Sequence, residues 1–290
     1  MEEEEETFEQ KVERTGGFPV LAVHRGGGAE FAPENTMYAF ERCLECGARL
    51  LETDLRLTRD GELCLMHDSS VERTTDGAGP VYAYTLEEVQ QLDAAHHYPA
   101  LRGRGIHVPS FAEFLARFAP LPDLLFLLDF KDEAAARRAL EMVAEYPALA
   151  ARCMVGSVFE APNRYLREKR ASPAQRPCVS DMGQTFAATI AYGTGAWPLY
   201  RFEHEVFGFI LRDETARFWS RGLVEAVRAR GVRVLVCGDW VSRVEVMRDC
   251  VAWGVEYIMT DRPDLLCEVV AAFGGEDDSA ESARNKSVVY

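Results

Sequence analysis

The sequence predicts an α/β protein built as a closed (β/α)8 barrel, the TIM-barrel architecture, with a small insertion after the second strand. Short apolar, β-rich runs recur eight times along the chain, and amphipathic stretches with helical spacing separate most of them. Strands that alternate with helices imply a parallel sheet, and eight such strands favour a closed barrel over an open sheet. The 290 residues suit one large domain and are few for two.

The predicted elements follow from these runs in chain order. The strands are expected at residues 19–24, 49–55, 124–130, 152–157, 176–180, 207–211, 232–237 and 257–260. The helices are expected at residues 35–46, 111–118, 132–145, 161–169, 214–230, 241–253 and 263–273. Most of these helices follow a predicted strand, as the alternating pattern of a barrel requires.

The alternation is interrupted between about residues 56 and 109, which we interpret as an insertion over the barrel mouth. Asp60-Gly61 lies between two apolar runs and predicts a hairpin turn, and a short helix is expected at residues 86–92. The segment 182–204 shows only a short helical pattern and is expected to be a loop or cap. The barrel domain is then residues 18–273, between disordered acidic tails at residues 1–17 and 274–290.

Composition excludes several classes of function. The formal net charge is −15, and an acidic chain without a basic stripe is a poor ligand for nucleic acid. The sequence has no apolar run of about 18 residues and no secretory leader pattern, so we expect no membrane span and a cytoplasmic location. The eight cysteines are then expected to be reduced, and Cys43-x-x-Cys46 is interpreted as core packing within a helix.

Three carboxylates are candidate metal ligands. Glu52 and Asp54 are separated by one residue on a predicted strand, so both side chains point to one face, the barrel interior. Asp129 ends the apolar run of another strand, where an unpaired charge would be costly. An all-oxygen ligand set favours one divalent cation, Mg²⁺ or Ca²⁺, over zinc. Ordinary salt bridges at the strand ends are the alternative interpretation.

Two histidines and two cations complete the candidate site. His24 follows the first predicted strand, and the glycines after Arg25 let backbone N–H groups approach an anion. His67 follows the return strand of the hairpin. Two imidazoles can divide the roles of general acid and general base, while Arg25 and Lys131 offer contacts to phosphate.

These residues occur in an order and spacing that resemble the glycerophosphodiester phosphodiesterase family, over roughly residues 19 to 270. The matching motifs are His24-Arg25-Gly26, Pro33-Glu34-Asn35-Thr36, Glu52-Thr53-Asp54, Thr58-Arg59-Asp60-Gly61, His67-Asp68, Arg73-Thr74-Thr75, Val108-Pro109-Ser110-Phe111, Asp129-Phe130-Lys131 and residues 254–263. The spacing Asp129-x-Lys131 is similar to the eukaryotic lysophospholipase D-like branch, whereas many other members have Glu at the position of Asp129.

The resemblance implies a TIM barrel and assigns roles by position. His24 and His67 look like the acid/base pair, and Arg25 and Lys131 look like phosphate contacts. Trp240 lies where the family places an aromatic substrate contact. Glu52, Asp54 and Asp129 look like the ligands of the metal.

The expected activity is metal-dependent hydrolysis of a glycerophosphodiester or lysophospholipid. The products would be glycerol 3-phosphate or lysophosphatidate, with a free alcohol headgroup. Two alternatives remain open, a sphingomyelinase D-like phospholipase and a barrel that binds phospholipid without catalysis. The expected partner is a small-molecule substrate and not nucleic acid. The sequence leaves the headgroup, the oligomeric state and the assignment of acid and base open.

Overall fold

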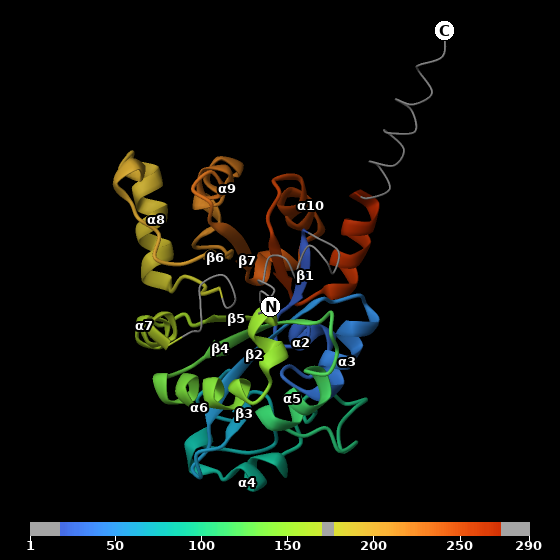
Figure 1. The fold of residues 1–290 in the computed structure, drawn as a ribbon. Coiled ribbons are helices and arrows are strands. Elements are labelled where there is room, and N and C mark those ends of the chain that lie inside the picture. Colours follow the sequence, from blue (N-terminus) through green and yellow to red (C-terminus); the bar gives the residue numbers. More distant parts are fainter. Residues whose placement is uncertain (1–17, 170–176, 274–290) are drawn as a thin grey trace, which may run out of the picture.

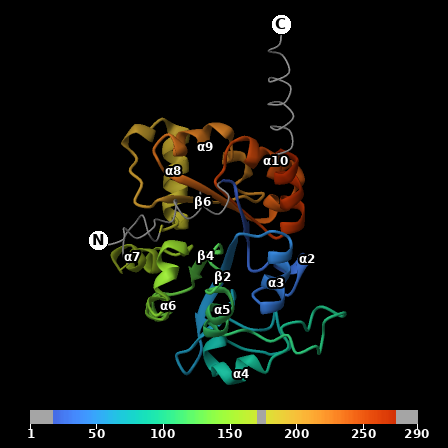
Figure 2. The same ribbon diagram turned by 45° about the vertical axis from the view of Figure 1, so that its right-hand side comes forward.

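The computed structural model describes residues 18–169 and 177–273, and it contains a closed barrel of parallel strands surrounded by helices (Figures 1 and 2). Neighbouring strands follow the order β5-β4-β2-β1-β8-β7-β6, with β3 paired antiparallel to β2. The predicted disorder of residues 1–17 and 274–290 concerns residues outside the described part. The strands are β1 (Val20–Val23), β2 (Leu50–Leu57), β3 (Leu63–Leu65), β4 (Leu125–Phe130), β5 (Cys153–Gly156), β6 (Val206–Ile210), β7 (Arg233–Cys237) and β8 (Tyr257–Thr260).

A short segment between β5 and β6 supplies the eighth parallel position and closes the barrel. Cys178 bridges to Val155 of β5, and Val179 bridges to Val206 of β6, both in the parallel sense. Backbone hydrogen bonds run from this segment to both neighbours, including Val179 N–H to the Val155 carbonyl. The predicted strand at 176–180 is therefore present only as isolated bridges, and Arg176 lies outside the described residues.

Helices cover the outside of the barrel, and the order of strand and helix is largely as predicted. They are α2 (Gly28–Phe31), α3 (Met37–Glu45), α4 (Leu86–Gln90), α5 (Phe111–Phe118), α6 (Glu133–Ala144), α7 (Glu160–Lys169), α8 (Met182–Thr194), α9 (Arg221–Arg228), α10 (Val244–Ala252) and a last helix at 263–273. Figure 1 places α8, α9 and α10 on one side of the barrel and α4, α5 and α6 on the other.

Strand alternation separates two cores. Side chains on the inner strand face, such as Leu50, Leu127 and Tyr257, fill the barrel, and outward residues such as Leu51 and Phe126 pack under the helices. Because successive side chains of a strand point to opposite faces, Glu52 and Asp54 share the inner face with Leu50. The predicted orientation of these two carboxylates is thus confirmed.

Two predictions of helical structure were wrong. Residues 182–204 were expected to be a loop or cap, yet α8 is a full helix of 13 residues, capped by Asp181 and Gln184 in a capping box. The expected helix 214–230 is interrupted, because Ser220 caps a new helix, α9, after a short 3-10 turn at Ala216–Phe218. Local capping residues decided both boundaries.

The segment between β2 and α5 has a small hydrophobic cluster of its own. The hairpin at Asp60-Gly61 is confirmed, because β2 and β3 pair antiparallel from Leu57 with Leu63 to Leu55 with Leu65. Val71, Val81, Val89 and Val108 belong to a separate cluster beneath this segment. Cys43 is fully buried in the main core on α3, whereas Cys46 at the end of that helix is only partly buried, so the interpretation as core packing holds for Cys43 alone.

Candidate active site

Three carboxylates converge at the carboxyl ends of β2 and β4. In the parallel pairing of these strands Asp54 stands directly beside Asp129, and Glu52 precedes them on the same face. One oxygen from each of Glu52, Asp54 and Asp129 lies within 4.8 Å of the others. Sheet register therefore brings together three acids that are up to 77 positions apart in the chain. These are the three ligands predicted from the sequence.

Buried positive charges hold this acidic cluster together. The Lys131 ammonium lies 2.5 Å from Asp54 Oδ1 and 2.6 Å from Asp129 Oδ2, and the Arg25 Nε atom lies 3.2 Å from Asp54 Oδ2. Burial opposes the charge on Lys131, but the two aspartates raise the pKa of its ammonium to about 12. Burial also opposes ionisation of Asp54, yet Lys131 and Arg25 keep the pKa of that carboxyl well below its usual range.

The negative charges of Glu52 and Asp129 are less well balanced by nearby positive charges. Burial, reinforced by the charge of Asp54, raises the pKa of Glu52 to about 8. Burial also raises the pKa of Asp129, despite the adjacent Lys131. The buried Asp129 Oδ1 atom has no hydrogen-bond donor among the described residues. An unpaired oxygen in a set of two buried carboxylates and one that faces a cavity fits a site for a hard divalent cation.

His24 is held by a carboxylate from the opposite end of the chain. Because β1 pairs with β8 in the closed barrel, the loop after β8 brings Asp261 Oδ1 to 2.8 Å from His24 Nδ1. Burial alone would lower the pKa of His24, but the hydrogen bond to Asp261, aided by the charge of Glu52, raises it despite the nearby Arg25. The hydrogen bond from His24 keeps the pKa of Asp261 low against the effect of burial.

His67 has a carboxylate partner of a different kind. Its Nδ1 atom lies 2.7 Å from Asp68 Oδ1, and Asp68 also accepts two hydrogen bonds from Arg73. Burial would raise the pKa of Asp68, but Arg73 and His67 hold it at about 2. Burial lowers the pKa of His67, and the charges of Lys131 and Arg25 act in the same direction. An ionised carboxylate on each Nδ1 leaves the Nε2 atom of both rings for chemistry.

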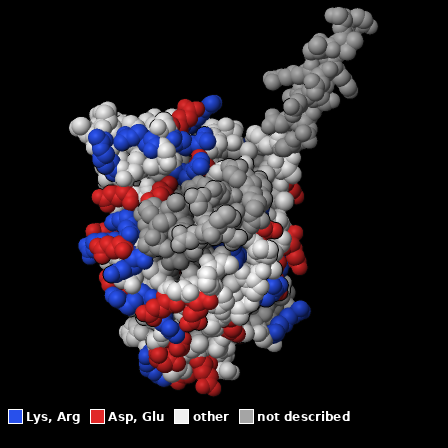
Figure 3. Space-filling view, viewed as in Figure 1, with Lys and Arg blue, Asp and Glu red and all other residues white. Residues whose placement is uncertain are grey.

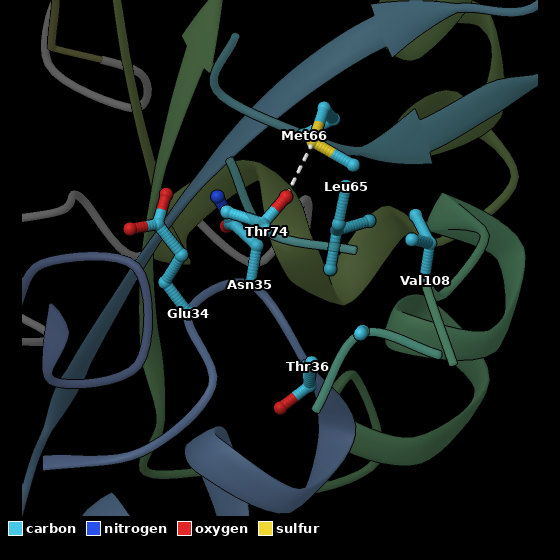
Figure 4. Close-up of a pocket in the computed structure, with 8 residues that line it drawn as sticks. Glu34, Asn35, Thr36, Leu65, Met66, Thr74 and Val108 are labelled. Carbon is cyan, nitrogen blue, oxygen red and sulfur yellow. Dashed lines mark hydrogen bonds between the residues drawn. The ribbon is translucent and has the colours of Figure 1, made fainter. Parts of the chain in front are cut away.

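Glu34 connects the two halves of the site. Arg73 donates to both of its carboxylate oxygens at 2.7 Å, and Arg25 approaches it at 3.4 Å. Figure 4 shows the loop of Glu34 and Asn35 facing Met66 and Thr74 around a cavity of about 10 Å³. Packing and ion pairs thus fix the segment that carries His67 against the loop after β1.

Asn35 orients one of the candidate ligands. Its Nδ2 group donates to Asp54 Oδ2 at 2.8 Å, while its Oδ1 atom accepts from the Thr53 hydroxyl at 2.9 Å. The backbone of Asn35 is left-handed, with φ of 54°, a conformation that Asn tolerates better than most residues. The helix cap is the next residue, Thr36, whose hydroxyl accepts from Ala39 N–H.

The groups with acid, base and cation chemistry face one cavity of about 700 Å³ at the barrel mouth. His24, Arg25, Glu52, His67 and Asp129 line this cavity, while Asp54 and Lys131 lie behind the lining.

Trp240 lies apart from these residues. Among the described residues the lining includes Asp239 but not Trp240, whose indole donates to Asp213. The sequence interpretation also missed Asp261 as a partner of His24, although its position directly after the last strand, beside the first strand of a closed barrel, was a usable signal.

Comparison with known proteins finds similar sequences in one family. The model of the "Glycerophosphoryl diester phosphodiesterase family" matches residues 24–161. A glycerophosphodiester phosphodiesterase from Caldanaerobacter subterraneus is 28% identical over 260 residues, 88% of this chain and 99% of that protein. Glycerophosphodiester phosphodiesterase 1 of Bos taurus is 46% identical over 79 residues, which cover 27% of this chain and 24% of that one.

Solved structures show the same fold. A glycerophosphoryl diester phosphodiesterase domain from Mycobacterium tuberculosis superimposes with a TM-score of 0.73 at 21% identity, covering 86% of this chain and 98% of that one. An Oleispira antarctica phosphodiesterase, solved with its product sn-glycerol-3-phosphate, has a TM-score of 0.71 at 19% identity, covering 87% and 97%. The matched family model and the full-length relative agree, and the chain is similar in sequence to glycerophosphodiester phosphodiesterases, which are phosphoric diester hydrolases, and shares their barrel fold.

Proposed function

We propose that the protein hydrolyses glycerophosphodiesters, with or without one acyl chain, between the phosphate and the headgroup alcohol. One water is consumed, and the products are glycerol 3-phosphate or lysophosphatidate and the free alcohol. The observation that carries the proposal is the convergence of two carboxylate-bound histidines, three carboxylates and Arg25 at one barrel mouth. These groups match the needs of phosphodiester cleavage, namely proton transfer and charge neutralisation.

Glu52, Asp54 and Asp129 would hold one divalent cation, Mg²⁺ or Ca²⁺. When bound, such a cation supplies Lewis-acid polarisation of a phosphoryl oxygen. Asn35 keeps Asp54 in its observed orientation through the 2.8 Å hydrogen bond. Lys131 neutralises the aspartates from behind, so the three acids can remain close together. Their buried position keeps competing water away from the ligand oxygens.

The two histidines differ in a way that supports an assignment of roles. Asp68 shares its charge with Arg73, so it stabilises a protonated His67 less than Asp261 stabilises a protonated His24. His67 is then the general base, which accepts a proton at Nε2 from the attacking water. His24 is the general acid, which donates its Nε2 proton to the leaving alkoxide.

Arg25 and Lys131 would stabilise charge on the phosphoryl oxygens. Arg25 lines the cavity beside both histidines, whereas the Lys131 ammonium is held by two aspartates and would have to move to contact phosphate. Trp240 is proposed as a substrate contact only if its loop moves, because its indole is engaged by Asp213. We infer a cytoplasmic place of action; no helix of the described residues is long and apolar enough to cross a bilayer.

The deciding experiment is a headgroup-release assay. Protein treated with EDTA is assayed with glycerophosphocholine and with lysophosphatidylcholine, after Mg²⁺ or Ca²⁺ is restored separately. We expect metal-dependent choline release that Asp129→Asn and His24→Ala abolish and that the surface variant Asp249→Asn leaves unchanged. Choline release from sphingomyelin alone would favour a sphingomyelinase D-like enzyme, and tight binding without turnover at any metal concentration would refute the catalytic proposal.

A further inference from the structure

The cavity that contains the histidines has a second, apolar half that the proposed chemistry does not use. The apolar residues that line it include Met182, Phe186, Ile190, Phe209 and Phe218. The first three come from α8, and the others come from β6 and from the turn that follows it. Polar and apolar halves therefore belong to one continuous space of about 700 Å³.

Barrel topology places the two halves on opposite sides of the mouth. In the closed strand order, the segment at 177–180 is four positions from β1, and β6 is four positions from β2. His24 follows β1 and Glu52 lies on β2, whereas α8 follows the opposite segment. A ligand whose phosphate lies at His24 and Glu52 can thus extend across the mouth toward α8. Figure 1 shows α8 at the edge of the barrel, beside β6.

Among the described residues, nothing covers the apolar wall completely, and its side chains remain partly exposed. Met182, Phe186 and Ile190 are spaced four residues apart on one stripe of α8 and are 46%, 62% and 47% exposed. The opposite side of the helix is buried through Ala188 and Ala191, whereas Thr189 lines the cavity beside the stripe. A helix normally buries its one apolar stripe, and an exposed apolar stripe beside a cavity marks a binding surface.

A headgroup such as choline and a bare glycerol offer little for this wall to bind. We propose that the α8 wall binds the single acyl chain of a lysophospholipid, so that the acylated glycerophosphodiester is the preferred substrate. This inference rests on the proposed function and deepens it. The reaction at phosphorus is unchanged: water supplies the new P–O bond, and the headgroup alcohol leaves. Burial of the chain against Phe186 and Ile190 adds binding energy far from the reacting atoms.

The test compares substrates that differ only in the chain, with Phe186→Ser as the variant and Leu199→Ser as its control. Both side chains are exposed, so neither change should impair folding, but only Phe186 lines the cavity. Glycerophosphocholine is compared with 1-acyl-glycerophosphocholines of six to twelve carbons, all below their micelle concentrations. In the wild type we expect kcat/KM to rise roughly tenfold for every two methylenes until the wall is filled.

The variants should show whether Phe186 affects binding of the acyl chain without affecting cleavage of the phosphodiester. Phe186→Ser should lower kcat/KM for the dodecanoyl substrate by roughly tenfold or more and leave glycerophosphocholine turnover unchanged, while Leu199→Ser changes neither. Equal loss on both substrates, or no dependence on chain length in the wild type, would overturn the inference and leave the proposed function standing.

A binding measurement separates failure of the inference from failure of the proposed function. If the wild type cleaves neither substrate with Mg²⁺ or Ca²⁺, the proposed function fails. Calorimetric titration of EDTA-treated protein with dodecanoyl-glycerophosphocholine then decides the role of the wall by itself. Weaker binding by Phe186→Ser than by Leu199→Ser supports an acyl site, and equal binding refutes it.

Discussion

At the scale of single residues, the two histidines differ mainly in the surroundings of the carboxylate that each one contacts. Asp261 pairs with His24, while Asp68 is shared between His67 and Arg73. One ring therefore has a pKa raised above its usual value and the other a pKa that burial lowers. A reaction that uses two histidines requires a neutral base and a protonated acid at the same pH.

This difference predicts a bell-shaped pH dependence of kcat/KM with limbs on either side of the ordinary pKa of histidine. Activity should fall at low pH, as His67 gains a proton and stops acting as a base. It should fall at high pH, as His24 loses the proton that it donates. The measurement is a pH–rate profile at saturating metal, and a profile with a single limb would count against the assignment.

Arg73 is a positioning residue whose removal should move one limb of that profile. In Arg73→Gln, Asp68 no longer shares its charge with a guanidinium, so the pKa of His67 should rise and the acidic limb should shift to higher pH. The loss of four hydrogen bonds to Glu34 and Asp68 should also lower kcat by roughly 10- to 100-fold.

Two further variants control for this effect. Arg73→Lys should restore part of the activity and of the limb position. Arg59→Gln removes an exposed pair with Glu88 in the same segment and should leave the profile unchanged. A fall in kcat with no movement of the limb would reduce Arg73 to a purely structural role.

At the scale of elements, the barrel closes between β5 and β6 through a steric fit. A Cβ atom on Gly208 would lie 2.7 Å from Val179 Cγ1, and one on Gly156 would lie 3.0 Å from Val179 Cβ. Two small residues thus make room for Val179 in the segment that supplies the eighth parallel position. The cavity and α8 are both built on this junction, so the junction positions the apolar wall.

A double-mutant cycle tests that fit. Gly208→Ala should destabilise the fold by about 1–3 kcal/mol through overpacking, and Val179→Ala should cost a similar amount through lost burial. The double variant should cost less than the sum, because the new methyl occupies the vacated space. Urea unfolding measures the terms, and strict additivity would argue against the contact.

Gly193 offers a matched control for the glycine substitution. It lies within α8, and a Cβ atom there would meet nothing within 4 Å. Gly193→Ala should therefore be neutral or should stabilise the protein by up to about 1 kcal/mol, since alanine favours the helix.

At the scale of the whole molecule, folding and the proposed metal should be coupled. The three carboxylates are brought together only in the folded state, so a bound cation should stabilise that state. At a concentration of about 100 Kd the stabilisation is about 2.7 kcal/mol, which should raise Tm by roughly 5 to 10 °C. Scanning calorimetry of EDTA-treated protein with and without Mg²⁺ or Ca²⁺ measures this shift.

Two variants make the metal prediction specific. Asp129→Asn should abolish most of the rise in Tm, because it removes a ligand charge from the cluster, whereas Asp249→Asn on the surface of α10 should retain it. An equal rise in Asp129→Asn and the wild type would place the cation elsewhere.

On the face seen in Figure 3, basic and acidic side chains are interspersed along one edge. Inside the cavity, the candidate reacting groups and the apolar wall come from different elements. The candidate reacting groups come from β2 and β4 and from the segments after β1 and β3, and the apolar wall comes from α8, β6 and the turn after β6.

The sequence by itself determined the barrel, the hairpin and the shared face of Glu52 and Asp54, because these depend on local patterns. Apolar runs of strand length alternate with helices, Asp60-Gly61 specifies a turn, and residues two apart on a strand share a face. The match of motif order also indicated the family before any contact was known. Such features can be predicted from the sequence because they involve residues close together in the chain.

Only the tertiary structure decided which groups act together. Asp261 reaches His24 across 237 positions because the barrel closes, and Arg73 reaches Glu34 across 39 because the inserted segment folds back. The length of α8 was also missed, since its exposed apolar stripe does not follow the usual pattern of a helix packed against a core. Hydrogen-bond partners and cavities depend on how distant segments pack together in the folded barrel. The local pattern of the sequence does not show that packing.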